Sequence, residues 1–465
     1  MRVTARDGWR EFLPRLEQLA TRAGLVYNPV DFEAVPDSFM MEISVYGFPV
    51  RMPHWSFGVR YISQLIQHRM GHSRLFEVVF PGNPGRAYLA RGNSLAENVL
   101  VTAHVLGHAD FSHNNLLFVR SQQQVGTRIV ERAAAHAHQI ARAIEEHGPE
   151  RIERILDAAL ALEQYVDVDQ PVGRPRYPEY LPAREDAAMD EFQKRYAALT
   201  ETGDARSSDH GLKRAPLPPR RERDLLWFIA QYAPELEGWE RDIFLAVREE
   251  SFYFYPVFAT QIMNEGWASY WHARLLREAD FLPQEAYLDA IKCHSDVVRP
   301  LAGGETVALA VNPYHVGFSL WEHIIEAGGV DAARRVMSED DDFSFIRNHL
   351  TPELAEKMQL FRYQSDDRGA VKVIEPDIGA LHDALLAPKY NFGAPAVSAM
   401  AVTVDGTLEL VHDHEVDGRG LDVERARRVL EYVERVWRRP VRLHTIDASG
   451  KDMDLTALRS DPSAK

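Results

Sequence analysis

Histidines and carboxylates recur at helical spacing in two separate stretches of this chain. In the first stretch, His104 and His108 are four residues apart, so on a helix they lie one above the other on the same face. Glu97 precedes His104 by seven residues, about two turns, and projects from roughly that face. The second stretch repeats this spacing, because Glu265 and His272 are also seven residues apart. The pattern predicts two helices whose imidazoles and carboxylates converge on one metal ion.

Each of these residues also has a structural interpretation. Ser94 and Glu97 fit the S-x-x-E capping box, in which the glutamate bonds the first amide of the helix instead of an ion. His104 and His108 lie in an apolar stretch and could be a buried pair bonded to carboxylates or carbonyls. Glu265, in an apolar setting, needs either a cation or a proton. The sequence leaves both interpretations open.

A metal centre also needs groups that move protons or orient ligands. Asp110 follows the histidine pair and could supply a hydrogen bond to a ligand or cap the helix. Glu97 and His272 could either bind the ion or move protons beside it. These three residues are the candidate catalytic residues. Three other histidines, His136, His138 and His147, do not share one helical face and are expected on a solvated helix.

Composition excludes several classes of protein. The net charge of −16 argues against a general nucleic-acid binder and against docking on an anionic membrane. Cys293 is the only cysteine of the 465 residues, which excludes an intrachain disulfide and a cysteine-based zinc site. No secretory signal is recognisable at the N-terminus, and no window approaches the ~20 apolar residues of a membrane span. We expect a cytoplasmic protein without membrane insertion.

Apolar periodicity predicts a mainly α fold for the first 395 residues. Helices are expected over 9–23, 61–68, 127–146, 150–165, 224–232, 240–250, 260–276, 283–299, 313–327 and 352–361, around the histidine helix, and a strand over 75–80. Residues 28–53 are interrupted by Pro29, Pro36 and Pro49 and are expected to be irregular or extended. We therefore predict a large helical main domain over residues 1–395. The proline-rich stretch 166–223 is expected to be a peripheral insert of it.

The pattern changes after residue 395. Alternating residues around Asp405-Gly406 predict a β-hairpin. A helix is expected over 423–438 and a closing strand over 440–446. Residues 396–465 should therefore form a small C-terminal α/β module, which makes the chain α+β overall.

Four motifs in this order, HWSFG, AHVLGHADF, NEGWASYWH and VNPYHVGF, resemble those of the SpoVR family, the stage V sporulation protein R group. The resemblance covers nearly the whole chain. It implies a role in sporulation, stress adaptation or cell-envelope remodelling, since the family also occurs in bacteria that form no spores. It also implies two partners, a serine protein kinase and a von Willebrand-type domain protein, because family members are often encoded beside them.

A second resemblance concerns the chemistry. NEGWA is similar to the NEGFA-type motif of gluzincin metallopeptidases, and the helix of His104 and His108 resembles their HExxH helix. The resemblance implies that His104, His108 and Glu265 bind zinc or another divalent metal. Val105 stands where those enzymes have the glutamate that takes a proton from the metal-bound water. This chain therefore departs from the standard mechanism.

Three functions remain open from the sequence. The first is metal-dependent hydrolysis of an amide or peptide-like bond. The second is a two-metal oxidative centre, indicated by the repeated Glu-x6-His spacing, although ferritin-like sites use Glu-x-x-His. The third is a non-catalytic regulatory or scaffold protein that works with the kinase, which would suit Val105. The hydrolase is the first choice.

Overall fold

The computed structural model describes residues 5–69, 76–168, 177, 216–299, 312–360, 362–365, 371–374, 377–447 and 449–458. Contacts divide the chain into two compact units. Unit 1 comprises Met1–Val166 and Glu237–Ala394, and unit 2 comprises Asp167–Leu236 and Pro395–Lys465.

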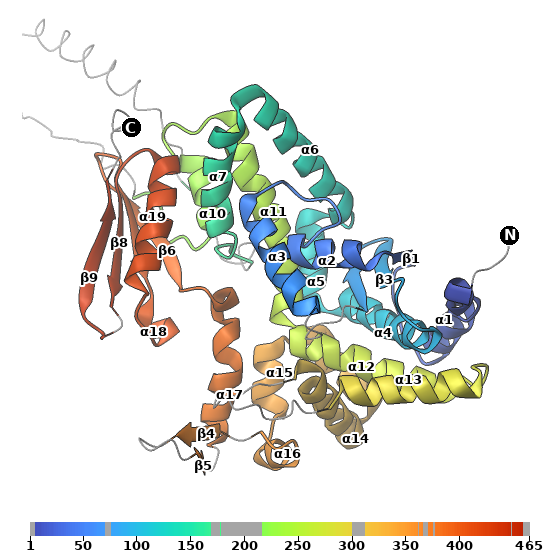
Figure 1. Cartoon of the computed structure of the whole chain (residues 1–465). Coiled ribbons are helices and arrows are strands. Elements are labelled where there is room, and N and C mark those ends of the chain that lie inside the picture. Colours follow the sequence, from blue (N-terminus) through green and yellow to red (C-terminus); the bar gives the residue numbers. More distant parts are fainter. Residues whose placement is uncertain are drawn as a thin grey trace, which may run out of the picture. The chain divides into compact units, whose positions relative to one another are not determined.

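Unit 1 is built mainly of helices, with two small sheets (Figure 1). Its elements in chain order are η1 (Ala5–Glu11), α1 (Leu13–Arg22), β1 (Val30–Val35), α2 (Asp37–Tyr46), α3 (Trp55–Arg69), β2 (Glu77–Phe80), β3 (Gly85–Ala90), α4 (Leu95–Asn114), α5 (Leu116–Val125), α6 (Ile129–His147), α7 (Pro149–Ala161), α11 (Gly238–Ala259), α12 (Gln261–Glu278), α13 (Gln284–Val297), α14 (Pro313–Glu339), α15 (Asp342–His349), α16 (Pro352–Lys357), β4 (Arg362–Ser365), β5 (Val371–Ile374), α17 (Ile378–Leu386) and η2 (Ala387–Gly393).

Helix α4 runs through the hydrophobic core of unit 1 and is buried on nearly all sides. A capping box begins it: Ser94 Oγ accepts a hydrogen bond from the Glu97 amide at 3.2 Å, and Glu97 Oε2 accepts one from the Ser94 amide at 2.6 Å. The helix ends at Asn115, whose side chain caps α5. A helix that is apolar all round must be covered on every side. Helices α1, α12 and α13 pack against α4 and supply this cover.

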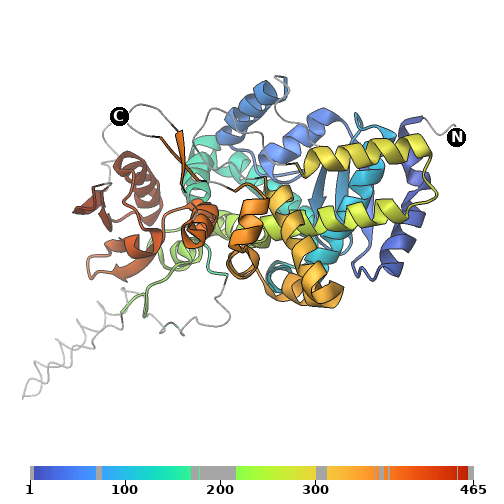
Figure 2. The same cartoon turned by 90° about the horizontal axis from the view of Figure 1, so that it is seen from below.

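Glycines let three of these helices approach at backbone distance. A methyl group on Gly107 of α4 would lie 2.7 Å from the Cα atom of Ala268 on α12. On the opposite side of α12, a methyl group on Gly266 would lie 2.2 Å from the carbonyl carbon of Gly317 on α14. Any larger residue would push these helices apart. The glycines therefore fix how closely α12 lies between α4 and α14. Figure 2 shows α12 and α13 as a helical hairpin.

A buried carboxylate holds the first turn of α12. Asp342 is fully buried and accepts hydrogen bonds from the amides of Ile262 and Met263, both at 2.9 Å. Lys389 Nζ pairs with the same carboxylate at 2.8 Å. A negative charge satisfies the free amides at a helix N-terminus and interacts favourably with the helix dipole. The position of α12 is therefore fixed at its start as well as along its length.

The three-stranded sheet of unit 1 has the order β1-β3-β2. Strand β1 pairs with β3 in parallel, and β2 pairs with β3 in antiparallel register, with Glu77 opposite Leu89 and Phe80 opposite Arg86. This pairing places Glu77 at the first position of β2. Both β2 and β3 contact α4, so the sheet lies against the histidine helix.

Unit 2 contains α10 (Leu225–Tyr232), β6 (Val397–Val402), β7 (Leu408–His412), α18 (His414–Asp417), α19 (Val423–Trp437), β8 (Val441–Ile446) and β9 (Asp452–Ala457). The sheet has the order β6-β7-β8-β9, and only the β7–β8 pair is parallel. Helix α19 makes the crossover between these two parallel strands. Trp437 at the end of α19 stacks on Phe228 of α10 at 6.0 Å.

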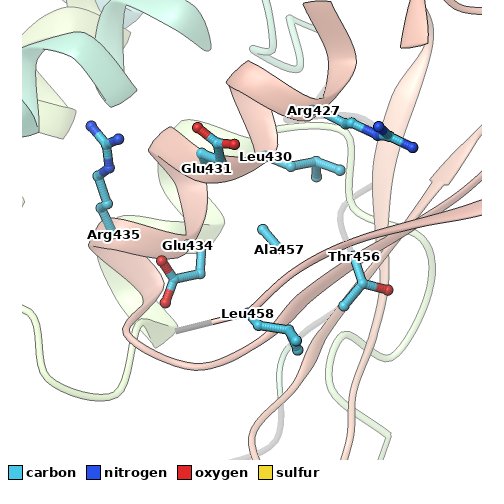
Figure 3. Close-up of a pocket in the computed structure, with 8 residues that line it drawn as sticks. All are labelled: Arg427, Leu430, Glu431, Glu434, Arg435, Thr456, Ala457 and Leu458. Carbon is cyan, nitrogen blue, oxygen red and sulfur yellow. The ribbon is translucent and has the colours of Figure 1, made fainter. Parts of the chain in front are cut away.

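A surface pocket lies between α19 and β9 of unit 2 (Figure 3). Both signs of charge line it, Arg427 and Arg435 together with Glu431 and Glu434, around apolar side chains such as Leu430. Among the helices that the structure describes, none is long and apolar enough to cross a membrane.

The structure confirms the predicted mainly α fold with a small C-terminal α/β module. The hairpin at Asp405-Gly406 is present, and α19 has nearly the expected bounds. One expectation is right in part and another is wrong. Of residues 28–53, expected to be irregular or extended, 30–35 form the extended strand β1, whereas 37–46 form the helix α2, because the prolines stand outside both elements. The strand at 440–446 does not close the sheet, since β9 follows it.

The expected boundary at residue 395, between domains that would fold separately, stays a prediction. Most of the insert expected over 166–223 lies outside the described residues. Its described end bonds to the C-terminal sheet, through an isolated bridge between Glu222 and Ala399.

Candidate metal centre

Helices α4 and α12 bring two histidines and one carboxylate together inside unit 1. His104 and His108 project from α4, and Glu265 projects toward them from the second turn of α12. Glu265 Oε2 lies 3.4 Å from His104 Nε2 and 3.5 Å from His108 Nε2. One ligand atom from each residue lies within 4.8 Å of the other two. The i, i+4 pair and the carboxylate of the second stretch therefore meet, as the spacing predicts.

The distances between these atoms suit a shared ion better than direct hydrogen bonds. An N–H···O bond is usually about 2.9–3.0 Å long, and both contacts exceed this. Ligands held about 2.0–2.2 Å from a tetrahedral ion are roughly 3.3–3.6 Å apart, which matches both contacts. His104 Nε2 and Glu265 Oε2 are moreover buried and have no hydrogen-bond partner. The three residues therefore fit a divalent metal.

Partners on the far side of each imidazole orient it. His108 Nδ1 lies 2.8 Å from Asn264 Oδ1. Because the amide oxygen can only accept, His108 Nδ1 carries the proton and Nε2 presents its lone pair. This is the usual arrangement of a metal-binding histidine, whose second nitrogen is bonded to an oxygen of the protein.

His104 is oriented by a chain of imidazoles. Its Nδ1 lies 3.0 Å from His272 Nδ1, and His272 Nε2 lies 2.6 Å from His294 Nδ1. If His104 presents the Nε2 lone pair to an ion, its Nδ1 donates to His272, which in turn donates to His294. Burial lowers the pKa of His272 well below its usual value, and burial together with Arg277 lowers that of His294 to about 4. Both rings are therefore neutral, as this direction of donation requires.

The electrostatics of the cluster favour an ionised Glu265. Burial alone would raise its pKa, but His108 and His104 together lower it below the usual value. Burial opposes the charge on His108 in the same way, and Glu265 raises the pKa of that imidazole. The negative charge of Glu265, together with burial, raises the pKa of Tyr314 well above 10.0. Tyr314 thus stays neutral, and its ring stacks on His104 with centroids 6.1 Å apart.

A second carboxylate, Glu77, also faces the cluster. Its Oε1 lies 3.9 Å from His104 Nε2, and 18% of its side chain is exposed. Burial raises its pKa, although His104 acts in the opposite direction. A cation among these donors would favour the ionised form of both carboxylates.

Two of the three candidate catalytic residues lie away from the three possible ligands. Glu97 forms the capping box of α4. Asp110 is fully buried and accepts hydrogen bonds from the Val26 amide at 2.7 Å and from Trp267 Nε1 at 2.9 Å. Arg334 lies 3.5 Å from the same carboxylate. Only His272 contacts a residue of the cluster, so the structure brings four of the six predicted site residues together. Their catalytic roles stay predictions.

Sequence reasoning missed three residues that contact the cluster, Glu77, Asn264 and Tyr314, and also His294, which bonds to His272. Asn264 and Tyr314 had a signal, because they lie within the NEGWASYWH and VNPYHVGF motifs. Asn312 caps α14 and Pro313 is its first residue, so the expected helix start is confirmed. That start directs Tyr314 toward Glu265. Glu77 had no signal, since a single glutamate at the start of a strand is common.

Fold and site together define a class of protein: a mainly helical protein with a buried cluster of two histidines and a glutamate. The chain belongs to the SpoVR family, since the family described as SpoVR like protein matches residues 7–386. The matched region includes every residue of the cluster. The chain is similar to the uncharacterized protein YcgB of Escherichia coli (strain K12), with 28% identity over 467 aligned residues that cover 92% of this chain and 89% of the relative. No solved structure matches the chain.

Proposed function

We propose that this SpoVR-family protein binds one divalent metal ion, zinc in the first instance, through His104, His108 and Glu265. The observation that carries the proposal is the convergence of three donor atoms at 3.4 and 3.5 Å, with His104 Nε2 and Glu265 Oε2 buried and without hydrogen-bond partners. Three protein ligands leave a coordination position open, which is typical of catalytic rather than structural zinc.

The reaction that this centre supports best is hydrolysis of an amide or peptide-like bond. The bound ion would supply a Lewis acid for a carbonyl oxygen and would make an attacking water more acidic. Glu265 and the two histidines hold the ion, and Asn264 and His272 fix the two imidazoles. Tyr314 stacks on His104, and its neutral hydroxyl can donate a hydrogen bond to an oxygen that gains charge.

The biological setting is proposed from the family resemblance. The protein would act in the cytoplasm in sporulation, stress adaptation or cell-envelope remodelling. A serine protein kinase and a von Willebrand-type domain protein are the proposed partners. A cytoplasmic peptide or cell-wall precursor is therefore a more accessible substrate than assembled peptidoglycan.

Metal analysis of the full chain, purified without chelator or His-tag, tests the proposal. Zinc near one equivalent is expected, and Glu265→Gln should lower zinc affinity by at least about 100-fold, because loss of a ligand exceeds the ~10–100-fold effect of losing a partner of a ligand. Iron or manganese near two equivalents would instead support the two-metal oxidative alternative. A metal-free protein with unchanged affinity in Glu265→Gln would support the scaffold alternative, which Val105 favours.

A further inference from the structure

Strand β2 carries a carboxylate to the metal cluster from a direction that neither helix provides. Glu77 is the first residue of β2, and the antiparallel register with β3 fixes its position opposite Leu89. Its Oε1 lies 3.9 Å from His104 Nε2, the atom that would bind the ion. A side chain on a paired strand is held more rigidly than one on a loop. Glu77 is therefore a fixed feature of the site.

The geometry places Glu77 beside the ligand sphere and not within it. Ligands about 2.1 Å from one ion are at most roughly 4.2 Å apart. The group whose ligand atoms lie within 4.8 Å of one another contains His104, His108 and Glu265, and Glu77 does not join it. At least one of the three donors is therefore too distant for Glu77 to share an ion with all of them.

Val105 makes this second carboxylate informative. In the HExxH helix that α4 resembles, the residue after the first histidine is a glutamate beside the open position of the metal. Here that residue is Val105, which is fully buried in the apolar core. Helix α4 therefore offers no carboxylate next to its first histidine. Glu77 reaches the neighbourhood of His104 from β2 instead.

We propose that Glu77 is the carboxylate that accepts a hydrogen bond from the proton-bearing molecule at the open position of the metal, a water or a substrate group. This inference rests on the proposed metal site and assigns its missing carboxylate. Glu77 thus takes the place of the HExxH glutamate, supplied by a strand rather than by the metal-binding helix. A carboxylate oriented toward the open position selects ligands that can donate a hydrogen bond over ligands that cannot.

The alternative is that Glu77 only pairs with His104 as a structural contact. The two roles separate in Glu77→Gln, which keeps the size of the side chain but removes the charge. If Glu77 only pairs with His104, the substitution should change the stability of the folded protein. It should not selectively change the affinity of any small molecule that binds the metal. An acceptor at the open position would affect a hydrogen-bond-donating ligand and leave metal binding largely intact.

The test uses the zinc-loaded full chain and two probes, acetohydroxamate, whose hydroxyl can donate to a neighbouring carboxylate, and azide, which has no proton to donate. Zinc affinity is measured by competition with a chromophoric chelator, and probe affinity by calorimetry. In Glu77→Gln, zinc affinity should fall by no more than about 10-fold. Acetohydroxamate affinity should fall by about 10–100-fold, the loss expected for one charge-assisted hydrogen bond, and azide affinity should stay unchanged.

Glu97→Gln is the matched control, because the same substitution is made at a carboxylate that the capping box occupies. It should leave zinc and both probes unchanged. Equal acetohydroxamate affinity in Glu77→Gln and wild type would overturn this inference but not the proposed function. A loss of zinc affinity as large as that in Glu265→Gln would also overturn it, because Glu77 would then be a ligand of the ion. Failure of the wild-type chain to bind zinc would overturn the proposed function and this inference together. Zinc binding by Glu77→Gln also shows that the variant has folded.

Discussion

Unit 1 contains two buried clusters of histidine and glutamate, and they differ in the source of positive charge. In the first, His136 of α6 lies 3.6 Å from Glu249 and 3.5 Å from Glu250, both on α11. Arg51 Nε donates to Glu250 Oε2 at 2.8 Å, and Arg132 pairs with Glu249. The protein therefore provides permanent cations for both carboxylates. We call this set the arginine cluster.

The second cluster, the candidate metal cluster of His104, His108 and Glu265 with Glu77 beside it, contains no such cation. In the part of the chain that the structure describes, neither carboxylate has an ion pair with lysine or arginine, and the ion-pair partners of both are imidazoles. Buried atoms without hydrogen-bond partners occur in both clusters, so these atoms alone do not distinguish them. A buried carboxylate without a permanent cation needs a proton or an ion. The comparison therefore supports placing the proposed divalent ion here rather than in the arginine cluster.

The comparison also corrects one expectation. His136 was expected on a solvated helix face, but only 14% of its side chain is exposed. Alanines surround it in the sequence, and alanine is common on both buried and exposed helix faces. Its partners come from α11, more than one hundred residues later in the chain. Helical spacing alone could not reveal them.

The largest expected effect is in the arginine cluster. Arg51→Met should lower the free energy of unfolding by about 3 kcal/mol, because Glu250 is fully buried and loses its guanidinium partner. His136 remains nearby, which keeps the loss at the lower end of the usual range. Chemical denaturation measures it. Arg86→Met is the control, since Arg86 and Glu131 are an exposed pair worth less than about 1 kcal/mol. Equal losses in the two variants would contradict the difference in burial.

Zinc should stabilise the folded chain through the metal cluster alone. At a free zinc concentration of 100 times Kd, binding adds about 2.7 kcal/mol to the free energy of unfolding. His108→Ala should abolish this gain, whereas His136→Ala should retain it, because the arginine cluster already has its cations. Thermal unfolding with and without zinc provides the measurement. A gain in stability that disappears in His136→Ala but persists in His108→Ala would contradict this prediction and place the ion in the arginine cluster.

The arginine cluster should also give stability a dependence on pH. Burial alone would lower the pKa of His136, but Glu249 and Glu250 raise it to about 9. The pKa of an unfolded histidine is about 6.5. Because the folded pKa is higher, the stabilisation is fully present below pH 6.5 and is lost as pH rises to about 9. Solvent reaches this cluster at Arg132, whose side chain is 51% exposed, and screening reduces the stabilisation to on the order of 1 kcal/mol. Wild type should exceed His136→Gln in stability at pH 6, and the difference should vanish above pH 9; a difference that grows with pH would refute the pairing.

How much the sequence could predict depended on whether partners were close along the chain. The i, i+4 spacing of His104 and His108 defines a helical face by itself, and the NEGWASYWH motif indicated Glu265. The sequence allowed the expectation that α4 and α12 meet, but not a prediction of how closely they pack. Their separation depends on glycine contacts such as Gly107 against Ala268. Glu77 could not be found, since β2 reaches the site through pairing with β3. Non-local contacts of this kind leave no periodic trace in a sequence.

The spacing of Glu97 was equally consistent with a ligand and with a helix cap, and the structure shows the cap. Glu97→Gln should change stability by less than about 0.5 kcal/mol, because glutamine can also complete a capping box. Glu97→Ala should cost about 1 kcal/mol, because the amide of Ser94 then loses its partner. Neither variant should change zinc affinity, since a residue occupied at the helix start does not bind the ion. Denaturation and chelator competition on the same samples measure both quantities. A zinc affinity at least 10-fold lower in Glu97→Gln, with unchanged stability, would show that Glu97 contributes to zinc binding. Helix capping would then not be its main role.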